Sequence, residues 1–363
     1  MADKYIMDGH KLHWHLDRVN DWLNGKRTVP VHIDVGLSKG CNIRCEYCFG
    51  VLQGNFYGKG SDIYFPREPL LRYVREAGEM GVRSMGFIGE AEPLLNPYVY
   101  EAIAEAKKAG VDVAMGTNGI LLNTGKTGIE ALGHLSWIRF NISAASKEAY
   151  IRIHRSKEFT TAVEKVTFCV ETKKRKDLNV TIGFQMVLTP TNVDQVIPLA
   201  KLGKALGVDY LVIKQCSDTV DSEIGVFSKL AEYDNFHNIL KEAESISSGD
   251  YNVIVKWKKI DNKGKRIYKQ CLGVPFLLYS SGDGKLYPCG MCFDYNRGME
   301  EEYRMGDLVR QSFKEIITSD RYWEIVEKVA KIDVNKCYSN CRTHAVNDFL
   351  WQLKHPPEHI NFV

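Results

Sequence analysis

The stretch Cys41-Asn42-Ile43-Arg44-Cys45-Glu46-Tyr47-Cys48 places three thiols within eight residues. It follows the run Val31-His32-Ile33-Asp34-Val35, which is typical of a strand, so we expect the thiols on a loop at the carboxyl end of that strand. Cysteine thiolates are the usual ligands of iron–sulfur clusters, and a cluster of four irons takes four of them. Three cysteines would therefore leave one iron without a protein ligand. A zinc site is the alternative, although zinc-binding cysteines usually come as two pairs or together with histidine.

The composition favours a large α/β chain with metal or redox chemistry. The 363 residues carry 48 basic and 45 acidic side chains, a net charge of +3, which provides no global field for binding nucleic acid. We find no signal peptide and no apolar run long enough to cross a membrane. Ten cysteines in such a chain indicate metal binding rather than disulfides, so we expect a cytoplasmic protein.

Strand and helix patterns alternate between residue 29 and about residue 215. The expected strands are Val31–Val35, Met85–Ile88, Val111–Met115, Trp137–Ile142, Val180–Leu188 and Tyr210–Lys214. Repeated strand–helix units predict a parallel sheet with right-handed crossovers. Because six units are too few for a closed eight-stranded barrel, we predict an α/β fold, an open partial (β/α)6 barrel with ligands at the carboxyl ends of its strands.

The C-x3-C-x2-C spacing, with the aromatic Tyr47 before the last cysteine, resembles the signature of the radical S-adenosylmethionine (SAM) enzymes. The resemblance implies that Cys41, Cys45 and Cys48 hold a [4Fe-4S] cluster whose open iron binds SAM. In that family one electron from the cluster cleaves SAM, and the resulting 5'-deoxyadenosyl radical abstracts a hydrogen atom from the substrate. A flavodoxin or ferredoxin would supply the electron.

The resemblance continues at the ends of the next strands. The segment 89–97 resembles the Gly-Gly-Glu-Pro motif that holds the SAM ammonium, with Ala91 in place of the second glycine and Glu92 preferred to Glu90. The resemblance implies SAM binding by Tyr47, Gly89, Glu90, Glu92, Asn118, Asn141, Ser143 and Gln185. The alternatives are an acidic capping turn, an Asn-Gly turn and a hydrogen-bonded core glutamine.

The sixth expected strand ends in Lys214-Gln215-Cys216-Ser217-Asp218, which we expect at the barrel mouth. Cys216 could give a hydrogen atom to a substrate radical, as a cysteine does in radical SAM epimerases, or it could be a small buried hydrophobe. Dehydrogenation would instead need a base, for which Lys214 and Asp218 are the candidates. Cys169 lies in an apolar helical pattern and is expected to pack in the core.

A second group of cysteines lies toward the end of the chain. A predicted hairpin with a Gly-rich turn at 281–284 leads into Cys289, and a predicted helix over 313–329 leads into Cys337 and Cys341. This arrangement resembles the SPASM extension, or its shorter twitch form, which holds auxiliary [4Fe-4S] clusters. Five cysteines suffice for one such cluster, so we assign Cys271, Cys289, Cys337 and Cys341 as ligands and keep Cys292 as a spare. A structural zinc would use the same four sulfurs.

These patterns divide the chain into an N-terminal helical segment (1–28), the barrel (29–220), a helical linker region (221–264), the auxiliary-cluster domain (265–345) and a C-terminal tail (346–363). The lysine-rich run 258–269 is expected to be a solvated hairpin, with phosphate binding as the alternative. We predict a radical SAM oxidoreductase or epimerase acting on a small molecule, with a sugar or cyclitol favoured. The alternatives are a maturase of ribosomal peptides and a non-catalytic iron–sulfur or zinc protein.

Overall fold

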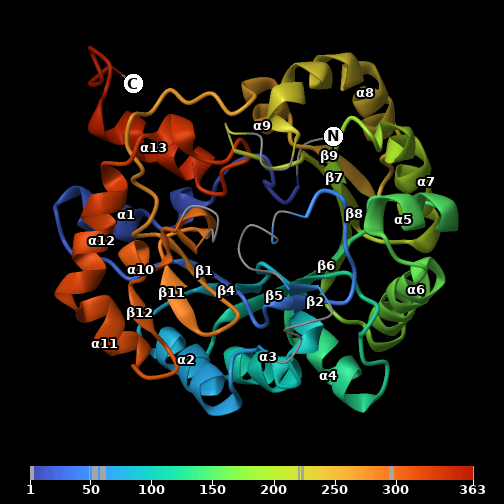
Figure 1. Cartoon of the computed structure of the whole chain (residues 1–363), viewed down its shortest axis with the longest axis horizontal. Helices are drawn as coiled ribbons and strands as arrows, with labels where there is room; N and C mark the ends of the chain where they lie inside the picture. Colours follow the sequence, from blue (N-terminus) through green and yellow to red (C-terminus); the bar gives the residue numbers. More distant parts are fainter. Residues whose placement is uncertain are drawn as a thin grey trace.

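The computed structural model describes residues 4–48, 50, 56–57, 63–219, 221, 225–293 and 298–362. Helices form an outer layer around the strands of a curved sheet (Figure 1). The strands are β1 His32–Val35, β2 Gly40–Cys41, β3 Phe56–Tyr57, β4 Ser84–Phe87, β5 Asp112–Thr117, β6 Leu135–Asn141, β7 Thr181–Leu188, β8 Tyr210–Gln215, β9 Asn252–Val255, β10 Leu277–Ser280, β11 Lys285–Tyr287 and β12 Gly306–Asp307.

The large sheet has the order β12-β11-β10-β1-β4-β5-β6-β7-β8-β9. All pairs from β10 to β9 are parallel, and β11 and β12 continue the other edge as antiparallel strands. No pairing joins β9 to β10 in the described part of the chain, so the barrel is open, as predicted. The six expected strands are confirmed, but two more parallel strands flank them. The sequence prediction missed β9 because three consecutive apolar residues carry no periodicity, and it did not foresee that β10 would pair with β1.

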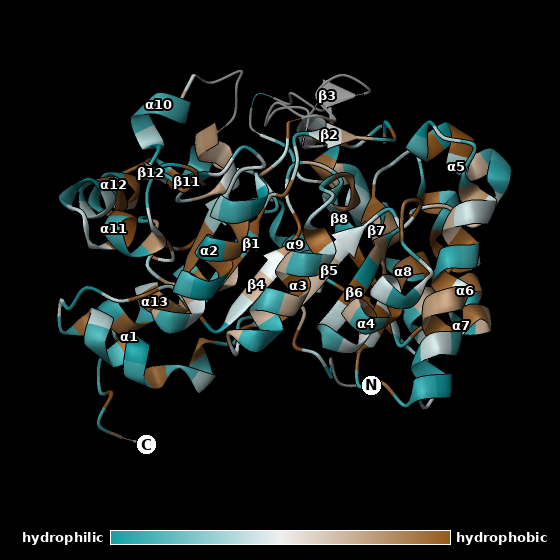
Figure 2. Ribbon diagram, turned by 90° about the horizontal axis from the view of Figure 1, so that it is seen from below, coloured by the Kyte–Doolittle hydropathy of each residue, from teal (hydrophilic) through white to brown (hydrophobic). Residues whose placement is uncertain are grey.

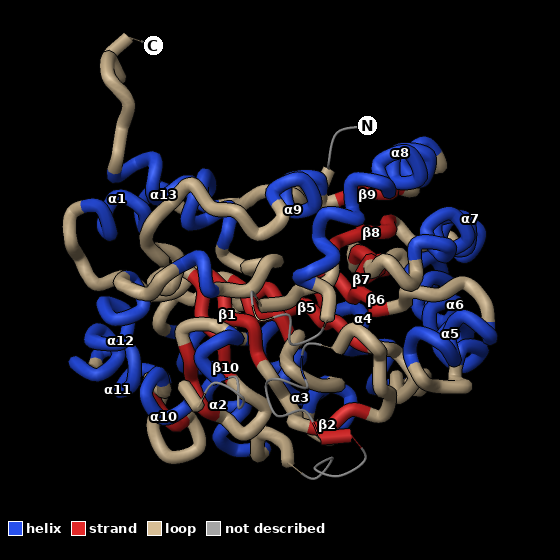
Figure 3. Tube along the Cα trace, turned by 45° about the horizontal axis from the view of Figure 1, so that its top comes forward, coloured by secondary structure: helices blue, strands red, loops and turns tan. Residues whose placement is uncertain are grey.

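The helices cover the outer face of the sheet (Figures 1 and 3). They are α1 Leu16–Leu23, α2 Arg67–Glu79, α3 Val99–Lys108, α4 Lys126–His134, α5 Lys147–His154, α6 Phe159–Lys176, α7 Val196–Leu206, α8 His237–Ser245, α9 Trp257–Asn262, α10 Glu300–Tyr303, α11 Phe313–Thr318, α12 Asp320–Ala330 and α13 His344–Lys354. Short 3-10 helices are η1 Leu12–Trp14, η3 Pro93–Leu95, η4 Val193–Gln195, η5 Phe227–Phe236, η6 Gly290–Phe293 and η8 Val334–Lys336.

Two helix predictions need correction. The expected helix over 313–329 is broken at Ser319, whose hydroxyl accepts the backbone N–H of Tyr322 and so begins α12 as a separate helix. The run 258–269 is not a solvated hairpin, because its first residues form α9 and Ile260 is buried there. Cys169, by contrast, packs in the core on α6, as expected.

Successive side chains along each strand point alternately to the core between sheet and helices and to the lumen of the barrel. On β6, Ile138 and Phe140 are buried in the layer between sheet and helices, whereas Arg139 and Asn141 are only partly buried and face inward. Apolar residues accordingly follow the inner faces of the helices (Figure 2). Among the described residues, no helix combines the length and the apolar character needed to span a membrane.

Candidate active site

The three-cysteine loop follows β1 at the carboxyl edge of the sheet, as predicted. Burial, and then the neighbouring thiols Cys48 and Cys41, raise the pKa of Cys45. Burial and the carboxylate of Glu92 raise the pKa of Cys41 to about 12. The protein therefore gathers these sulfurs where bare thiolates are unfavourable, and positively charged irons would compensate for that cost. The thiol set fits an iron–sulfur cluster.

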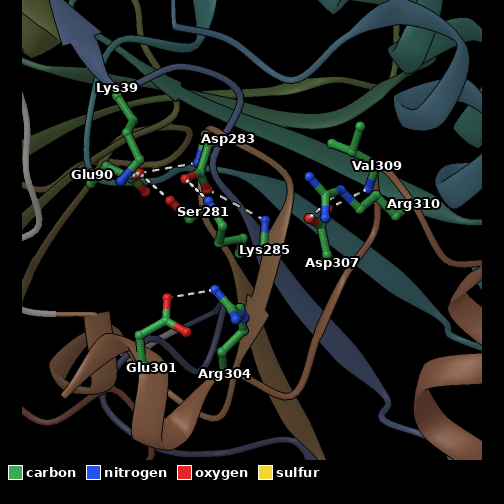
Figure 4. A network of polar contacts seen from close by, with 11 residues as sticks. Lys39, Glu90, Ser281, Asp283, Lys285, Glu301, Arg304, Asp307, Val309 and Arg310 are labelled. Atoms are coloured by element: carbon green, nitrogen blue, oxygen red, sulfur yellow. Dashed lines mark hydrogen bonds and ion pairs between the residues drawn. The ribbon is translucent and has the colours of Figure 1, made fainter.

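Glu90 connects the loop after β4 to the C-terminal hairpin (Figure 4). Its Oε1 accepts hydrogen bonds from the hydroxyl of Ser281 at 2.7 Å and from the N–H of Gly282 at 3.0 Å, and the ammonium of Lys39 lies 3.7 Å away. Both charged side chains are buried. Glu90 therefore joins two segments 191 residues apart in the sequence, a position that sequence reasoning did not foresee.

Three glycines allow the backbones around Glu90 to approach closely. A Cβ at Gly89 would lie 2.5 Å from the Cα of Gly36, and a Cβ at Gly36 would lie 2.8 Å from the nitrogen of Gly282. These neighbours are backbone atoms, which cannot move aside as a flexible side chain can. Gly89 is thus required by packing between the β1 and β4 loops.

Gly36→Ala is therefore expected to lower the free energy of unfolding by about 1–3 kcal/mol, the usual range for overpacking. Urea denaturation of the anaerobically prepared protein measures this change. Gly249→Ala is the matched control, because a Cβ there meets nothing within 4 Å and the backbone is not left-handed. Equal stability of the two variants would contradict the packing argument.

Glu92 connects the same loop to the end of β5. Its carboxylate accepts hydrogen bonds from the Thr117 hydroxyl at 2.5 Å, the Asn118 N–H at 2.8 Å and the Leu94 N–H at 3.1 Å. Burial raises the pKa of Glu92 to about 7 despite these donors. Asn118 in turn donates to the side chain of Asn42 in the cysteine loop at 2.7 Å. Glu92 and Asn118 thus lie beside the cysteines, where the resemblance implied SAM contacts.

Four further residues predicted to contact SAM meet one another in two pairs. The hydroxyls of Tyr47 and Ser143 are 2.8 Å apart, and Ser143 accepts the N–H of Val187 at 3.1 Å. On the inner face of the sheet, the Gln185 amide donates to the Asn141 oxygen at 2.8 Å. The structure therefore gathers the residues predicted from five strand ends at one edge of the barrel. The SAM-binding roles themselves stay predictions.

Cys216 and Asp218 are both fully buried, and Cys216 lies against the three-cysteine loop. The Cys216 thiol is fully buried and faces the carbonyls of Tyr47 at 3.9 Å and Ser217 at 3.5 Å. The Asp218 carboxylate accepts the backbone N–H groups of Thr219 and Val226, each at 2.8 Å. These contacts favour the packing alternative for Cys216 and a loop-closing role for Asp218.

Lys214 differs from them because it is only partly buried and points into the lumen from β8. Burial, and then the charges of Lys259, Arg139 and Arg342, lower the pKa of Lys214 to about 7. The nearby Cys216 has a smaller effect and raises the pKa of Lys214. Lys214 is thus the one predicted catalytic residue whose environment suits a base near neutral pH.

The five late cysteines also come together. Burial, and then Cys341 and Cys289, raise the pKa of Cys271 to about 12. Burial and the neighbouring thiols of the same group also raise the pKa of Cys337. Cys289 and Cys292 have their sulfurs 3.6 Å apart. Within the described ranges no three histidine, cysteine or carboxylate side chains converge on a single metal-ion position. A four-iron cluster needs no such convergence, because its thiolates bind different irons.

Comparison with known families identifies both cysteine regions. Residues 35–203 match the model of the Radical SAM superfamily, and residues 277–343 match SPASM, an iron–sulfur cluster-binding domain. This chain belongs to the radical SAM superfamily. Its cofactors are accordingly SAM, a [4Fe-4S] cluster in the barrel and an auxiliary cluster in the C-terminal region. The two matches confirm the predicted family and the predicted cofactors of this radical SAM enzyme.

Curated relatives of this radical SAM enzyme include proteins that act on nucleotides. The S-adenosylmethionine-dependent nucleotide dehydratase of Flammeovirga pacifica is 27% identical over 141 residues, 38% of this chain and 47% of the relative. The GTP 3',8-cyclase of Aquifex aeolicus is 25% identical over 313 residues, 80% of this chain and 90% of the relative. The chain spans about half the length of the Flammeovirga protein and of the Helicobacter pylori GTP 3',8-cyclase.

Solved structures share the fold. SuiB of Streptococcus suis superposes with a TM-score of 0.63 at 14% identity, covering 83% of this chain and 68% of SuiB. The structure of anSMEcpe with bound AdoMet superposes with a TM-score of 0.58 at 17% identity, covering 84% of this chain and 85% of that protein. At such identities these neighbours establish the partial barrel fold.

The sequence prediction did not include several residues that lie near the site. Arg139 on β6 donates to Gln185 at 2.9 Å and to the Tyr210 hydroxyl at 3.1 Å, and Arg342 donates to Asp34 of β1 at 3.0 Å. Burial acts to raise the pKa of Asp34, but the charge of Arg342 holds that pKa well below its usual range. An arginine on a strand gives no local signal of function, because its role depends on which strands surround it.

Proposed function

We propose that this radical SAM enzyme dehydrogenates an alcohol carbon of a sugar or cyclitol that carries a phosphoryl group, with Lys214 as the base. When bound, the SAM-binding cluster with SAM supplies hydrogen-atom abstraction, and the auxiliary cluster supplies an electron acceptor. The residues of the chain then have two tasks. They bind and orient the anionic substrate, and they take up the hydroxyl proton.

The observation that carries this proposal is the positive charge inside the barrel. Arg139, Lys214, Lys256, Lys259 and Arg342 come from β6, β8, the end of β9, α9 and the segment before α13, and their charges act on one another. Arg342 is neutralised by Asp34, and Asp8 lies near Lys256. The contacts recorded in the described residues give neither Arg139 nor Lys214 a carboxylate partner.

Clustered cations of this kind are unfavourable unless an anion joins them. A phosphoryl group fits because guanidinium and ammonium groups bind phosphate oxygens strongly. The nucleotide substrates in the names of two relatives support the same chemistry. Since the Cys216 thiol is buried, it is poorly placed to return a hydrogen atom to a substrate, which favours dehydrogenation over epimerisation.

The test is a substrate comparison. Anaerobically reconstituted enzyme with SAM and dithionite is given a hexose, its phosphate ester and a nucleoside diphosphate sugar, and release of deoxyadenosine and oxidised product is followed. We expect the phosphorylated compounds to be turned over and the neutral hexose to be inactive. Turnover of the neutral sugar alone, or of a peptide alone, would contradict the proposal.

Arg139→Gln is expected to raise the KM for the phosphorylated substrate about 10- to 100-fold, because it removes a charge-assisted contact. Slow deoxyadenosine release without substrate should be unchanged, since the hydrogen bonds of Arg139 within the described residues go to Gln185 and Tyr210 rather than to the cysteine loop. Arg75→Gln on the outer face of α2 is the matched control, because Arg75 is exposed and its guanidinium pairs with Glu105 of α3 at 3.6 Å. An unchanged KM in Arg139→Gln would remove Arg139 from the binding site.

A further inference from the structure

The last turn of α5 is attached to the three-cysteine loop by its backbone. The N–H of Arg44 donates to the carbonyl of His154 at 3.2 Å, and the N–H of Glu46 donates to the carbonyl of Ile153 at 2.9 Å. Carbonyls at a helix C-terminus lack partners within the helix, so they are free to accept these bonds. The cysteine loop is therefore fixed against a helix that begins more than a hundred residues later in the sequence.

The side chain of His154 makes a third connection. Its Nδ1 lies 3.1 Å from the sulfur of Cys45, and its Nε2 accepts the backbone N–H of Ser143 at 2.9 Å. Because a backbone amide can only donate, Nε2 must carry the lone pair. The ring proton of the neutral imidazole is therefore on Nδ1, which makes the histidine the donor and the sulfur the acceptor.

The surroundings hold the imidazole in this orientation. His154 is completely buried, and the ring of Tyr150 lies against it with a centroid separation of 4.3 Å. Ser143 is itself fixed, because its hydroxyl bonds to Tyr47 at 2.8 Å and accepts the N–H of Val187 at 3.1 Å. The N–H···S contact is thus supported from β7, from the β6 loop and from the helix that carries the histidine.

We propose that His154 is a positioning residue for the SAM-binding cluster: its Nδ1–H donates a hydrogen bond to the Cys45 thiolate and raises the reduction potential of that cluster. A hydrogen bond to a ligand sulfur stabilises the reduced form more than the oxidised form, because the reduced cluster places more negative charge on its sulfurs. The proposal concerns electron uptake before any substrate binds. Its outcome is therefore independent of the phosphorylated substrate proposed above.

The first test measures the reduction potential of the holoenzyme. His154→Phe removes the donor, His154→Gln offers another N–H, and Tyr150→Phe is the matched control that keeps the ring against His154 and removes only a hydroxyl. Redox titration followed by EPR selects the relevant cluster, because added SAM changes the spectrum of that cluster alone. We expect a more negative potential in His154→Phe, recovery toward wild type in His154→Gln and no change in Tyr150→Phe. We also expect deoxyadenosine release to fall about 10- to 100-fold in His154→Phe, the usual cost of losing a ligand-supporting contact.

The second test needs no folded variant. Wild-type enzyme labelled with 15N-histidine is reduced, and pulsed EPR is used to detect a 15N nucleus coupled to the SAM-binding cluster. We expect one such coupling, lost on substitution of His154 wherever the variant loads its iron. Absence of any histidine coupling in the wild-type protein, or an unchanged potential in a fully loaded His154→Phe variant, would overturn the proposal.

Discussion

Lys214→Gln is expected to lower formation of the oxidised product by about 10²- to 10⁴-fold, the usual contribution of a positioned base. Release of deoxyadenosine should continue, because the substitution leaves the cysteine loop intact. Product formation by the wild-type enzyme should rise with pH through about 7, since the base must be unprotonated and burial with Lys259, Arg139 and Arg342 lowers the pKa of Lys214 to that value. Comparing deoxyadenosine with product across pH measures both effects.

Lys214→Arg is the matched control for charge. Arginine keeps a long cationic side chain in the lumen but cannot give up its proton in a protein, so product formation should stay as low as in Lys214→Gln. Cys216→Ala distinguishes the reaction types. If dehydrogenation is correct, this variant should keep forming product, whereas loss of product with continued deoxyadenosine release would make Cys216 the hydrogen donor and the reaction an epimerisation.

Cys271→Ala is expected to reduce the iron content from about eight to about four atoms per chain, because one of two four-iron clusters loses a ligand. Product formation should fall below detection, while the SAM-binding cluster remains and still cleaves SAM. The reason is that the charges of Cys271, Cys289, Cys337 and Cys341 act on one another, whereas the thiol contact that the described residues give Cys292 is with Cys289, at 3.6 Å. Iron analysis and EPR after anaerobic reconstitution measure the change.

Cys292→Ala is the comparison within the same group of cysteines. If Cys292 is the spare thiol, this variant should keep about eight irons per chain. An iron content of about four in Cys292→Ala, together with about eight in Cys337→Ala, would exchange the two residues in the ligand assignment. That outcome would leave the presence of an auxiliary cluster intact and change only its fourth ligand.

Local sequence was sufficient for the features that depend on neighbouring residues. The spacing of Cys41, Cys45 and Cys48 identified the cluster loop, and alternating strand and helix patterns gave the six central strands with errors of one or two residues at their ends. The Gly-rich turn predicted at 281–284 correctly indicated the hairpin formed by β10 and β11. These features succeeded because thiol spacing, period and turn residues are all set within about ten residues of chain.

The features that local sequence left open share a different cause. Cys216 and Lys214 lie two residues apart, yet Cys216 is fully buried against the cysteine loop, whereas Lys214 is only partly buried. Lys259 belonged to an apparently solvated lysine run, but its ammonium is only partly exposed and donates to the carbonyl of Cys341 at 3.0 Å. Composition could not separate these cases, because burial depends on what packs from other elements.

The sequence by itself determined the cofactor inventory: three cysteines for the cluster that binds SAM, a later set for the auxiliary cluster, and a barrel to hold them. Only the tertiary structure decided which side chains surround those cofactors. His154 lies 109 residues from Cys45, Ser281 lies 191 residues from Glu90, and Arg342 lies 308 residues from Asp34. The physical reason is that parallel strands bring their carboxyl ends together through register and crossover packing, so residues remote in sequence become neighbours without any local pattern that marks them.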